Sequence, residues 1–135
     1  MLSTSAKYAI RAVEFLLDHS TENKRIRAIE ISIGIAVPQP YLSKILQDLS
    51  KGDIISSAKG PNGGFYLNKA NKEKSLWDVV VCIDGIAEFN KCYMGTPNCD
   101  ANNPCSLHDL ALEFRTSLIN NLKGRRVDRL GVHKK

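Results

Sequence analysis

The chain has 135 residues, a length that fits one compact domain or one small domain with an appendage. Hydrophobic residues make up 43% of it, which excludes a wholly disordered chain. No apolar run approaches the roughly 18 residues that cross a membrane, and the charges within the first apolar stretch are unlike those of a signal peptide. We therefore expect a cytoplasmic protein with no membrane partner.

The net charge of +5 is unevenly distributed along the chain. Residues 44–74 contain six Lys or Arg against three acids, and residues 123–135 contain six against one. The intervening residues 75–122 contain two against six. This distribution fits one surface for a polyanion and another for a different task, although an ordinary solvated surface would also account for it.

Apolar residues at helical spacing predict a helix over 4–19, with Thr4 as its cap. A shorter helix is expected over 26–35, where alternating isoleucines also suit a strand. A third helix with prolines in its first turn is expected over 38–50, and Gly52 can supply the left-handed residue past its end. Two short helices joined by a tight turn predict a helix-turn-helix.

Two strand-like runs follow at 54–58 and 65–67, separated by the Gly/Pro/Asn-rich residues 59–64. This pattern predicts a β-hairpin, which directly after a helix-turn-helix is a wing. The glycine-rich turn is not a phosphate-binding loop, because neither Gly-Lys-Ser/Thr nor a helix follows it.

A capping box predicts the start of a buried helix over 75–84, and the Gly-, Pro- and Asn-containing residues 91–105 are expected to form a loop. A second capping box, Ser106 with Asp109, predicts a long helix that ends at Gly124. Its apolar stripe is too long for this small domain to cover alone, so we expect the helix to pair with its copy in a homodimer.

The predicted fold class is mainly α with a small β-hairpin wing: a winged helix-turn-helix domain plus a long C-terminal dimerisation helix. Residues 1–70 form the winged domain. Residues 71–124 contain a linker helix, a cysteine-rich loop (91–108) and the dimerisation helix. The basic residues 125–135 are expected to be a disordered tail.

Three of the four cysteines lie close together in the sequence, and a histidine follows them. Cys92, Cys99 and Cys105 are separated by six and five residues, and His108 comes after two more. Three thiolates and an imidazole are enough ligands for a tetrahedral Zn²⁺ or for an iron–sulfur cluster. Cys105 and His108 lie three apart at a helix start, where the helix dipole favours negative sulfur.

Other interpretations of these residues remain open. Structural zinc sites usually show paired C-x₂₋₄-C knuckles, which the wide spacing here lacks, so a cluster is favoured without excluding zinc. The thiols could also be unrelated to one another. Cys82 lies beside an apolar helix stripe and is expected to be a small core residue, whereas His19 and His133 have no clustered partners.

These motifs together resemble the winged-helix transcription regulators typified by IscR, the iron–sulfur cluster regulator, and NsrR, the nitric-oxide-sensing repressor. The matching segments are KYAIRA in the first helix (7–12), YLSKIL in the third (41–46), SSAKGPNGGF in the wing (56–65) and the three-cysteine loop. The resemblance covers residue 1 to about residue 122, in order. Ala36 occupies a position where these regulators usually have a turn glycine.

The resemblance implies a homodimeric regulator, a repressor, that binds double-stranded operator DNA under the control of a cluster. It implies Cys92, Cys99, Cys105 and His108 as the ligands of a [2Fe–2S] cluster, as in IscR-like members. NsrR-like members instead use an acid in the first helix, and residues 7–10 contain none. The signal would be iron–sulfur status, redox state or nitric oxide. A regulator with zinc or with no cluster is the alternative.

The DNA-binding residues are expected on the third helix and the wing. A recognition helix lies in the major groove, so its polar residues would meet base edges or phosphate. The wing tip is small and basic, which suits the minor groove. The candidates are Gln39, Tyr41, Ser43, Lys44, Lys59, Gly60, Pro61 and Asn62.

A small redox or electron-transfer protein is the rival from another class. The sequence has no nucleophile elbow, dinucleotide fingerprint or paired carboxylates in a plausible site. A protein that only transfers electrons would also have little use for a basic helix-turn-helix and wing. We therefore expect no enzymatic activity and no small-molecule substrate.

Overall fold

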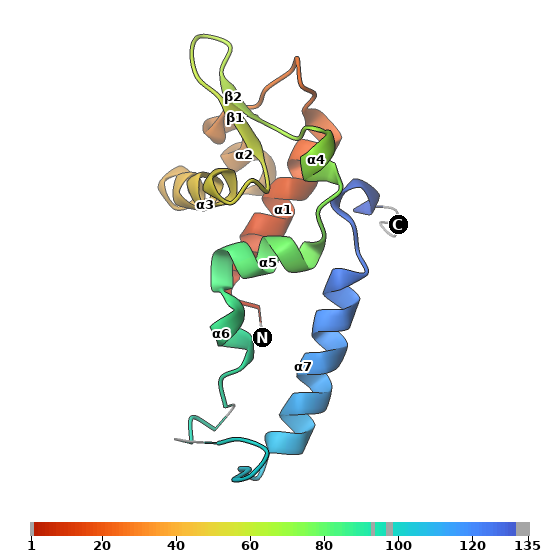
Figure 1. Ribbon diagram of the computed structural model, residues 1–135. Coiled ribbons are helices and arrows are strands. Elements are labelled where there is room, and N and C mark those ends of the chain that lie inside the picture. The colour runs from red at the N-terminus through yellow and green to blue at the C-terminus, as the bar shows by residue number, and fades with distance from the viewer. Residues whose placement is uncertain (1, 93, 97–98, 132–135) are drawn as a thin grey trace.

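The computed structural model describes residues 2–92, 94–96 and 99–131 of the chain. Helices dominate these residues, and two antiparallel strands form the sheet (Figure 1). The elements in chain order are α1 (Thr4–His19), α2 (Ala28–Ile35), α3 (Gln39–Lys51), β1 (Ser56–Ala58), β2 (Gly64–Tyr66), α4 (Lys69–Lys72), α5 (Leu76–Asp84), α6 (Ile86–Phe89), α7 (His108–Lys123) and the 3₁₀ helix η1 (Val127–Arg129). The mainly α architecture with a β-hairpin wing confirms the predicted fold class.

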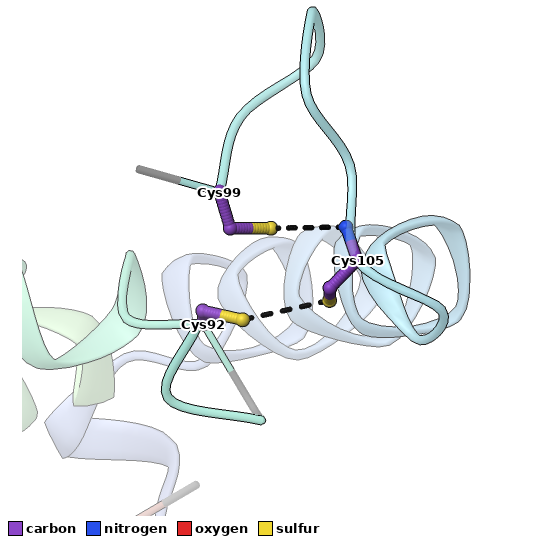
Figure 2. Close-up of side chains that lie close together, drawn as sticks. All are labelled: Cys92, Cys99 and Cys105. Atoms are coloured by element: carbon purple, nitrogen blue, oxygen red, sulfur yellow. Dashed lines mark hydrogen bonds between the residues drawn. The ribbon is translucent and has the colours of Figure 1, made fainter. Parts of the chain in front are cut away.

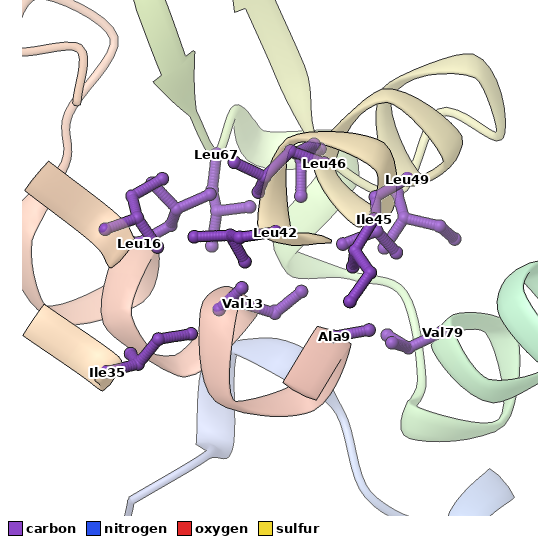
Figure 3. Close-up of a cluster of buried hydrophobic side chains, with 14 of the residues drawn as sticks. Ala9, Val13, Leu16, Ile35, Leu42, Ile45, Leu46, Leu49, Leu67 and Val79 are labelled. Carbon is purple, nitrogen blue, oxygen red and sulfur yellow. The ribbon is translucent and has the colours of Figure 1, made fainter. Parts of the chain in front are cut away.

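The core of the N-terminal half forms where α2 and α3 pack against α1. From α1, Val13 and Leu16 turn inward, and from α3, Leu42, Leu46 and Leu49 meet them (Figure 3). All five side chains are fully buried. Full burial of one such side chain stabilises a fold by about 1.5–3 kcal/mol. The apolar faces that predicted the first and third helices therefore also fix the helix-turn-helix.

The wing is a short hairpin that a third segment extends. β1 pairs with β2 in the register Ser56 to Tyr66 and Ala58 to Gly64. On the other side of β2, Ile26 donates its N–H to the Phe65 carbonyl at 2.9 Å and accepts the Phe65 N–H at 2.7 Å. This pairing attaches the wing to the segment that leads into α2. The expected helix over 26–35 is accordingly shorter, and the alternating isoleucines at 29–35, which also suited a strand, lie in α2.

The C-terminal half is built on α5, α6 and α7. The predicted capping box at the start of α5 is confirmed, because Ser75 and Asp78 each accept the other's backbone N–H. A second apolar cluster then packs α7 against α5 and α6, with Phe89 and Leu122 among its buried members. In Figure 1, α7 runs in a similar direction to α6, α5 lies across the molecule near the C-terminal end of α7, and the cysteine-rich loop lies at the end of the molecule opposite the wing.

Two predicted helix caps are wrong, although α1 spans the predicted residues 4–19. Ser3, rather than Thr4, caps α1, because α1 begins one residue earlier than a Thr4 cap requires. α7 begins at His108, with Leu107 at the N-cap position and no side-chain cap bond, so the expected capping box at Ser106 does not form. Sequence shows which residues can cap a helix, but loop geometry decides which one is in position.

The predicted disordered tail is also wrong for residues 125–131. Leu76 donates its N–H to the Arg125 carbonyl at 2.9 Å, and Val127 donates to the Lys74 carbonyl at 2.8 Å. The Val127 side chain is fully buried in the main core. One buried valine and two backbone hydrogen bonds therefore hold this basic segment in place. Residues 132–135, which include His133, lie outside the described part of the chain.

Two non-glycine residues among those described have left-handed backbone conformations. Ala36 follows α2 with φ 56°, and Asp53 has φ 58° after α3. Asp53 thus takes the left-handed position that was predicted for Gly52, whose φ is −84°. Aspartate tolerates this region better than alanine, for which it costs about 1–2 kcal/mol. Ala36 is therefore a strained residue in the turn between α2 and α3.

Replacing Ala36 by glycine should raise the free energy of unfolding by about 0.5–1 kcal/mol. Glycine removes the backbone strain, but it also raises the conformational entropy of the unfolded chain, which cancels part of the stabilisation. Chemical denaturation with an unchanged m-value would measure it. The control Ala12→Gly, inside α1, should lower stability by about 1 kcal/mol or more. An Ala36→Gly protein that is less stable than the wild type would show that Ala36 is not strained.

Candidate metal centre and nucleic-acid interface

Three cysteines converge where the loop between α6 and α7 folds back on itself. Cys92 follows α6, Cys99 lies within the loop, and Cys105 precedes α7. Their sulfur atoms all lie within 4.8 Å of one another, and all three side chains are half-buried. The Cys92 and Cys105 sulfur atoms are hydrogen-bonded to each other at 3.5 Å, and the Cys105 backbone N–H donates to the Cys99 sulfur at 3.3 Å (Figure 2). Soft ligand atoms at this separation can share one ion or one cluster.

His108 adjoins this group through one of the cysteines. Its Nδ1 atom lies 3.5 Å from the Cys99 sulfur, and it is the first residue of α7. The structure therefore gathers the three predicted cysteine ligands in one group and places the predicted histidine beside Cys99, outside the group of atoms within 4.8 Å of one another. A donor set of three sulfur atoms and one nitrogen atom suits zinc or an iron–sulfur centre and is a poor match for Mg²⁺ or Ca²⁺, which prefer oxygen.

The surroundings of the sulfur atoms separate the acidities of the cysteines. A hydrogen bond from the Thr96 backbone, with help from Cys105, lowers the pKa of Cys92 to about 6, although burial opposes the shift. The Cys105 backbone N–H also stabilises the Cys99 thiolate, but burial and the two neighbouring sulfur atoms outweigh it and raise the pKa of Cys99. Cys92 is thus a thiolate at neutral pH, the form that binds metals.

Cys82 has a different environment on α5. It packs against the main core, as expected, and its thiol donates to the Asp48 carbonyl at 3.3 Å. Burial, together with the Asp48 charge, raises the pKa of Cys82. This cysteine is a protonated, packed thiol, and it supplies an internal control for the chemistry of the loop.

In metal-free protein, Cys92 should therefore react with iodoacetamide faster than Cys82 at pH 7. Because a lowered pKa puts the thiolate in excess above it, the Cys92 rate should rise through a midpoint near pH 6 and level off. Cys82 should still be slow at pH 8. Peptide mass spectrometry of timed samples gives both rates. Equal rates for the two cysteines at pH 7 would contradict the difference between their pKa values.

The candidate DNA surface of α3 is its solvent-facing side. Gln39, Tyr41 and Lys44 are exposed there and Ser43 is half-buried, while the opposite face of the helix is in the core. Lys44 pairs with Asp48 at 3.2 Å. This ion pair is exposed, so it holds Lys44 only weakly against a phosphate or a base.

Tyr41 already has partners within the chain. Its hydroxyl lies 2.6 Å from the Ser5 hydroxyl, and its ring makes an edge contact with Tyr8 at 5.6 Å between centroids. These contacts tie the first turn of α3 to the first turns of α1. Gln47, an exposed residue one turn beyond Ser43, is a candidate contact that sequence reasoning missed.

The wing tip is exposed from Lys59 to Asn62. Gly63 is required next to it, because a Cβ atom there would lie 2.5 Å from the Ala58 carbonyl oxygen. Sequence reasoning also missed Arg27, whose guanidinium donates to the Pro61 carbonyl at 2.6 Å and so braces the tip. The basic run just before α2 was the available signal, but the contact spans 34 residues.

A helix-turn-helix with a wing, followed by a cysteine loop and a long helix, defines a winged-helix regulator with a candidate metal centre. The chain belongs to the Rrf2 family, described as an iron-dependent transcriptional regulator, whose family model matches residues 2–132. The expected resemblance to IscR-type regulators is thereby confirmed. No helix in the described part of the chain is both long and apolar enough to pass through a membrane.

Individual relatives agree with this assignment. The transcriptional regulator IscR of Pectobacterium carotovorum is 26% identical over 90% of this chain and 74% of its own length. The global cysteine regulator CymR of B. subtilis has the same fold, with a TM-score of 0.77 at 14% identity over 100% of this chain and 98% of that one. For IscR of T. potens the TM-score is 0.71 at 18% identity, over 96% and 85%. These relatives are regulators rather than enzymes.

Proposed function

We propose that the chain is a homodimeric, DNA-binding repressor whose operator binding is controlled by an iron–sulfur cluster of the [2Fe–2S] type. Cys92, Cys99, Cys105 and His108 would be its ligands. The observation that carries the proposal is the convergence of three cysteine sulfur atoms within 4.8 Å, beside a histidine. The cytoplasm, where free thiols stay reduced, is the compartment that suits it.

Two observations favour a cluster over zinc. The ligand spacing lacks the tight knuckles of structural zinc sites. Curated relatives of this chain are named IscR, the regulator type whose resemblance implies a cluster. A cluster supplies a change of charge and oxidation state, while the chain's own residues hold it and pass its state to the DNA-binding surface.

The DNA would meet two surfaces on the winged domain, residues 1–70. α3 would enter the major groove with Gln39, Ser43 and Lys44 toward the base edges, and Lys59 in the wing would meet phosphate or the minor groove. The exposure of these side chains supports this arrangement. We propose that Tyr41 mainly positions α3 through its contacts with α1.

The dimer would form through α7 in the second part of the chain, residues 71–124. One side of this helix packs against α5 and α6, but Leu107, Leu110, Leu112 and Phe114 are 39–63% exposed. Large apolar side chains clustered along one solvated helix favour an interface, and a copy related by two-fold symmetry offers the same surface. Such a dimer presents two winged domains to one operator.

The state of the loop could reach α3 through the first turn of α1. α5 and α6 lead directly into Cys92, and Asp84 at the end of α5 accepts hydrogen bonds from the Ser3 backbone N–H at 3.1 Å and from its hydroxyl. Two residues further along, Ser5 contacts Tyr41 on α3. A shift of the α5–α6 arm would therefore act on the recognition helix through short polar contacts.

Anaerobically purified protein should be red-brown, and Cys92→Ala, Cys99→Ala or Cys105→Ala should each abolish the visible absorbance. Cys82→Ala is the matched control and should keep it. His108→Ala should lose the colour more slowly, because water or another residue can fill that position. A colourless wild-type protein with stoichiometric zinc would show that the site holds zinc rather than a cluster. Colour lost in Cys82→Ala but kept in Cys99→Ala would refute the ligand assignment.

Light scattering and binding isotherms should show two chains on one duplex with inverted half-sites. Lys59→Ala should weaken binding to specific and scrambled duplexes alike and reduce the salt slope by about one for each phosphate that is no longer neutralised. Replacing Lys44, Gln39 or Ser43 by alanine should relax sequence preference, at about 1–3 kcal/mol per base contact. Arg125→Ala, which removes an exposed charge outside both the winged domain and α7, is the charge control. Unchanged affinities for both lysine variants would exclude this surface.

A further inference from the structure

Arg115 occupies an unexpected position on α7. The side of this helix that is turned away from solvent is marked by Ala111, Leu118 and Leu122, which are four residues before, three after and seven after Arg115. These intervals place Arg115 on the same inward stripe. Helix packing alone would favour an apolar residue there, so the arginine needs another explanation.

The contacts of Arg115 within the described part of the chain leave one of its buried hydrogen-bond donors without a partner. Its Nη2 atom donates to the Lys91 carbonyl at 3.1 Å. Its Nε atom is buried and has no hydrogen-bond partner among the described residues. A buried donor without a partner lowers the free energy of unfolding. Leucine or methionine at the same position would carry no such donor and no such penalty.

The place of the hydrogen bond gives the explanation. Lys91 directly precedes Cys92, while Arg115 is seven residues, or about two turns, beyond His108 on the same face of α7. The bond therefore joins the arm that carries Cys92 to the helix that follows Cys105. It crosses this gap without using any sulfur atom, so ligand binding by the sulfur atoms does not require it to break.

We propose that Arg115 is a positioning residue for the metal centre: it holds the Cys92 arm against α7 so that the sulfur atoms stay assembled before an ion or cluster arrives. This inference rests on the proposed function of the loop. Partners that orient ligands commonly contribute about 10–100-fold to metal affinity. The nearby pair of Lys91 with Glu88 joins two residues of the same arm and does not reach α7, so it cannot hold the arm against that helix.

The test compares Arg115→Met with the wild type, using Co²⁺ as an optical probe of thiolate coordination in anaerobic, metal-free protein. We expect the dissociation constant for Co²⁺ to rise about tenfold. The melting temperature of the metal-free variant should stay equal or rise, because the unpaired buried Nε is removed. Amide exchange of residues 89–92 should become faster. Arg115→Lys keeps the charge without the planar donor fork and should recover only part of the affinity.

Arg125→Met removes an exposed arginine away from the loop and should leave both the Co²⁺ affinity and the melting temperature unchanged. Equal Co²⁺ affinity in Arg115→Met and wild type would overturn the proposal for Arg115 alone. Weaker binding together with a lower melting temperature of the metal-free variant would also overturn it, since the arginine would then be structural. If the wild-type protein gives no thiolate-to-cobalt absorbance, the loop does not bind metal. That result would overturn both the proposed function of the loop and the proposed role of Arg115.

Discussion

Apolar packing of α7 against α5 and α6 holds the two ends of the cysteine loop together. Val80 and Phe89 from one side meet Leu118, Ile119 and Leu122 from the other. Because α6 leads into Cys92 and α7 follows Cys105, this packing places the two arms that carry these cysteines. Burial of apolar surface thus brings the two arms together, and the loop contributes the local turns that place the ligands.

The same packing keeps the candidate metal centre at the end of the molecule opposite the wing, as Figure 1 shows. In the proposed complex the cluster would therefore act on DNA through protein rather than by contact. The contacts of Ser3 with Asp84 and of Ser5 with Tyr41 are suited to this because both begin in one helical turn of α1. In the proposed complex, the first turn of α1 would pass movement of the α5–α6 arm to α3, the helix that would lie in the groove.

Features with strong periodicity or a local chemical signature were predictable from sequence. The stripe of α1, the capping box of α5 and the turn of the wing each depend on residues a few positions apart. The short helices α4 and α6 have too few turns to show a period. The ordered segment around Val127, by contrast, depends on a core assembled from distant parts of the chain, so its basic composition suggested disorder instead.

In the candidate site, too, local patterns were predictable from sequence and contacts between distant residues were not. Cysteine spacing predicted a shared site, because few other arrangements bring so many thiols into one loop. Arg115 could not be predicted, since its partner Lys91 is 24 residues away and the bond is to a backbone carbonyl, which leaves no side-chain pattern in the sequence. What the sequence does contain is an arginine on an apolar stripe. Such a mismatch between helix face and residue type points to function, because stability alone would select against it.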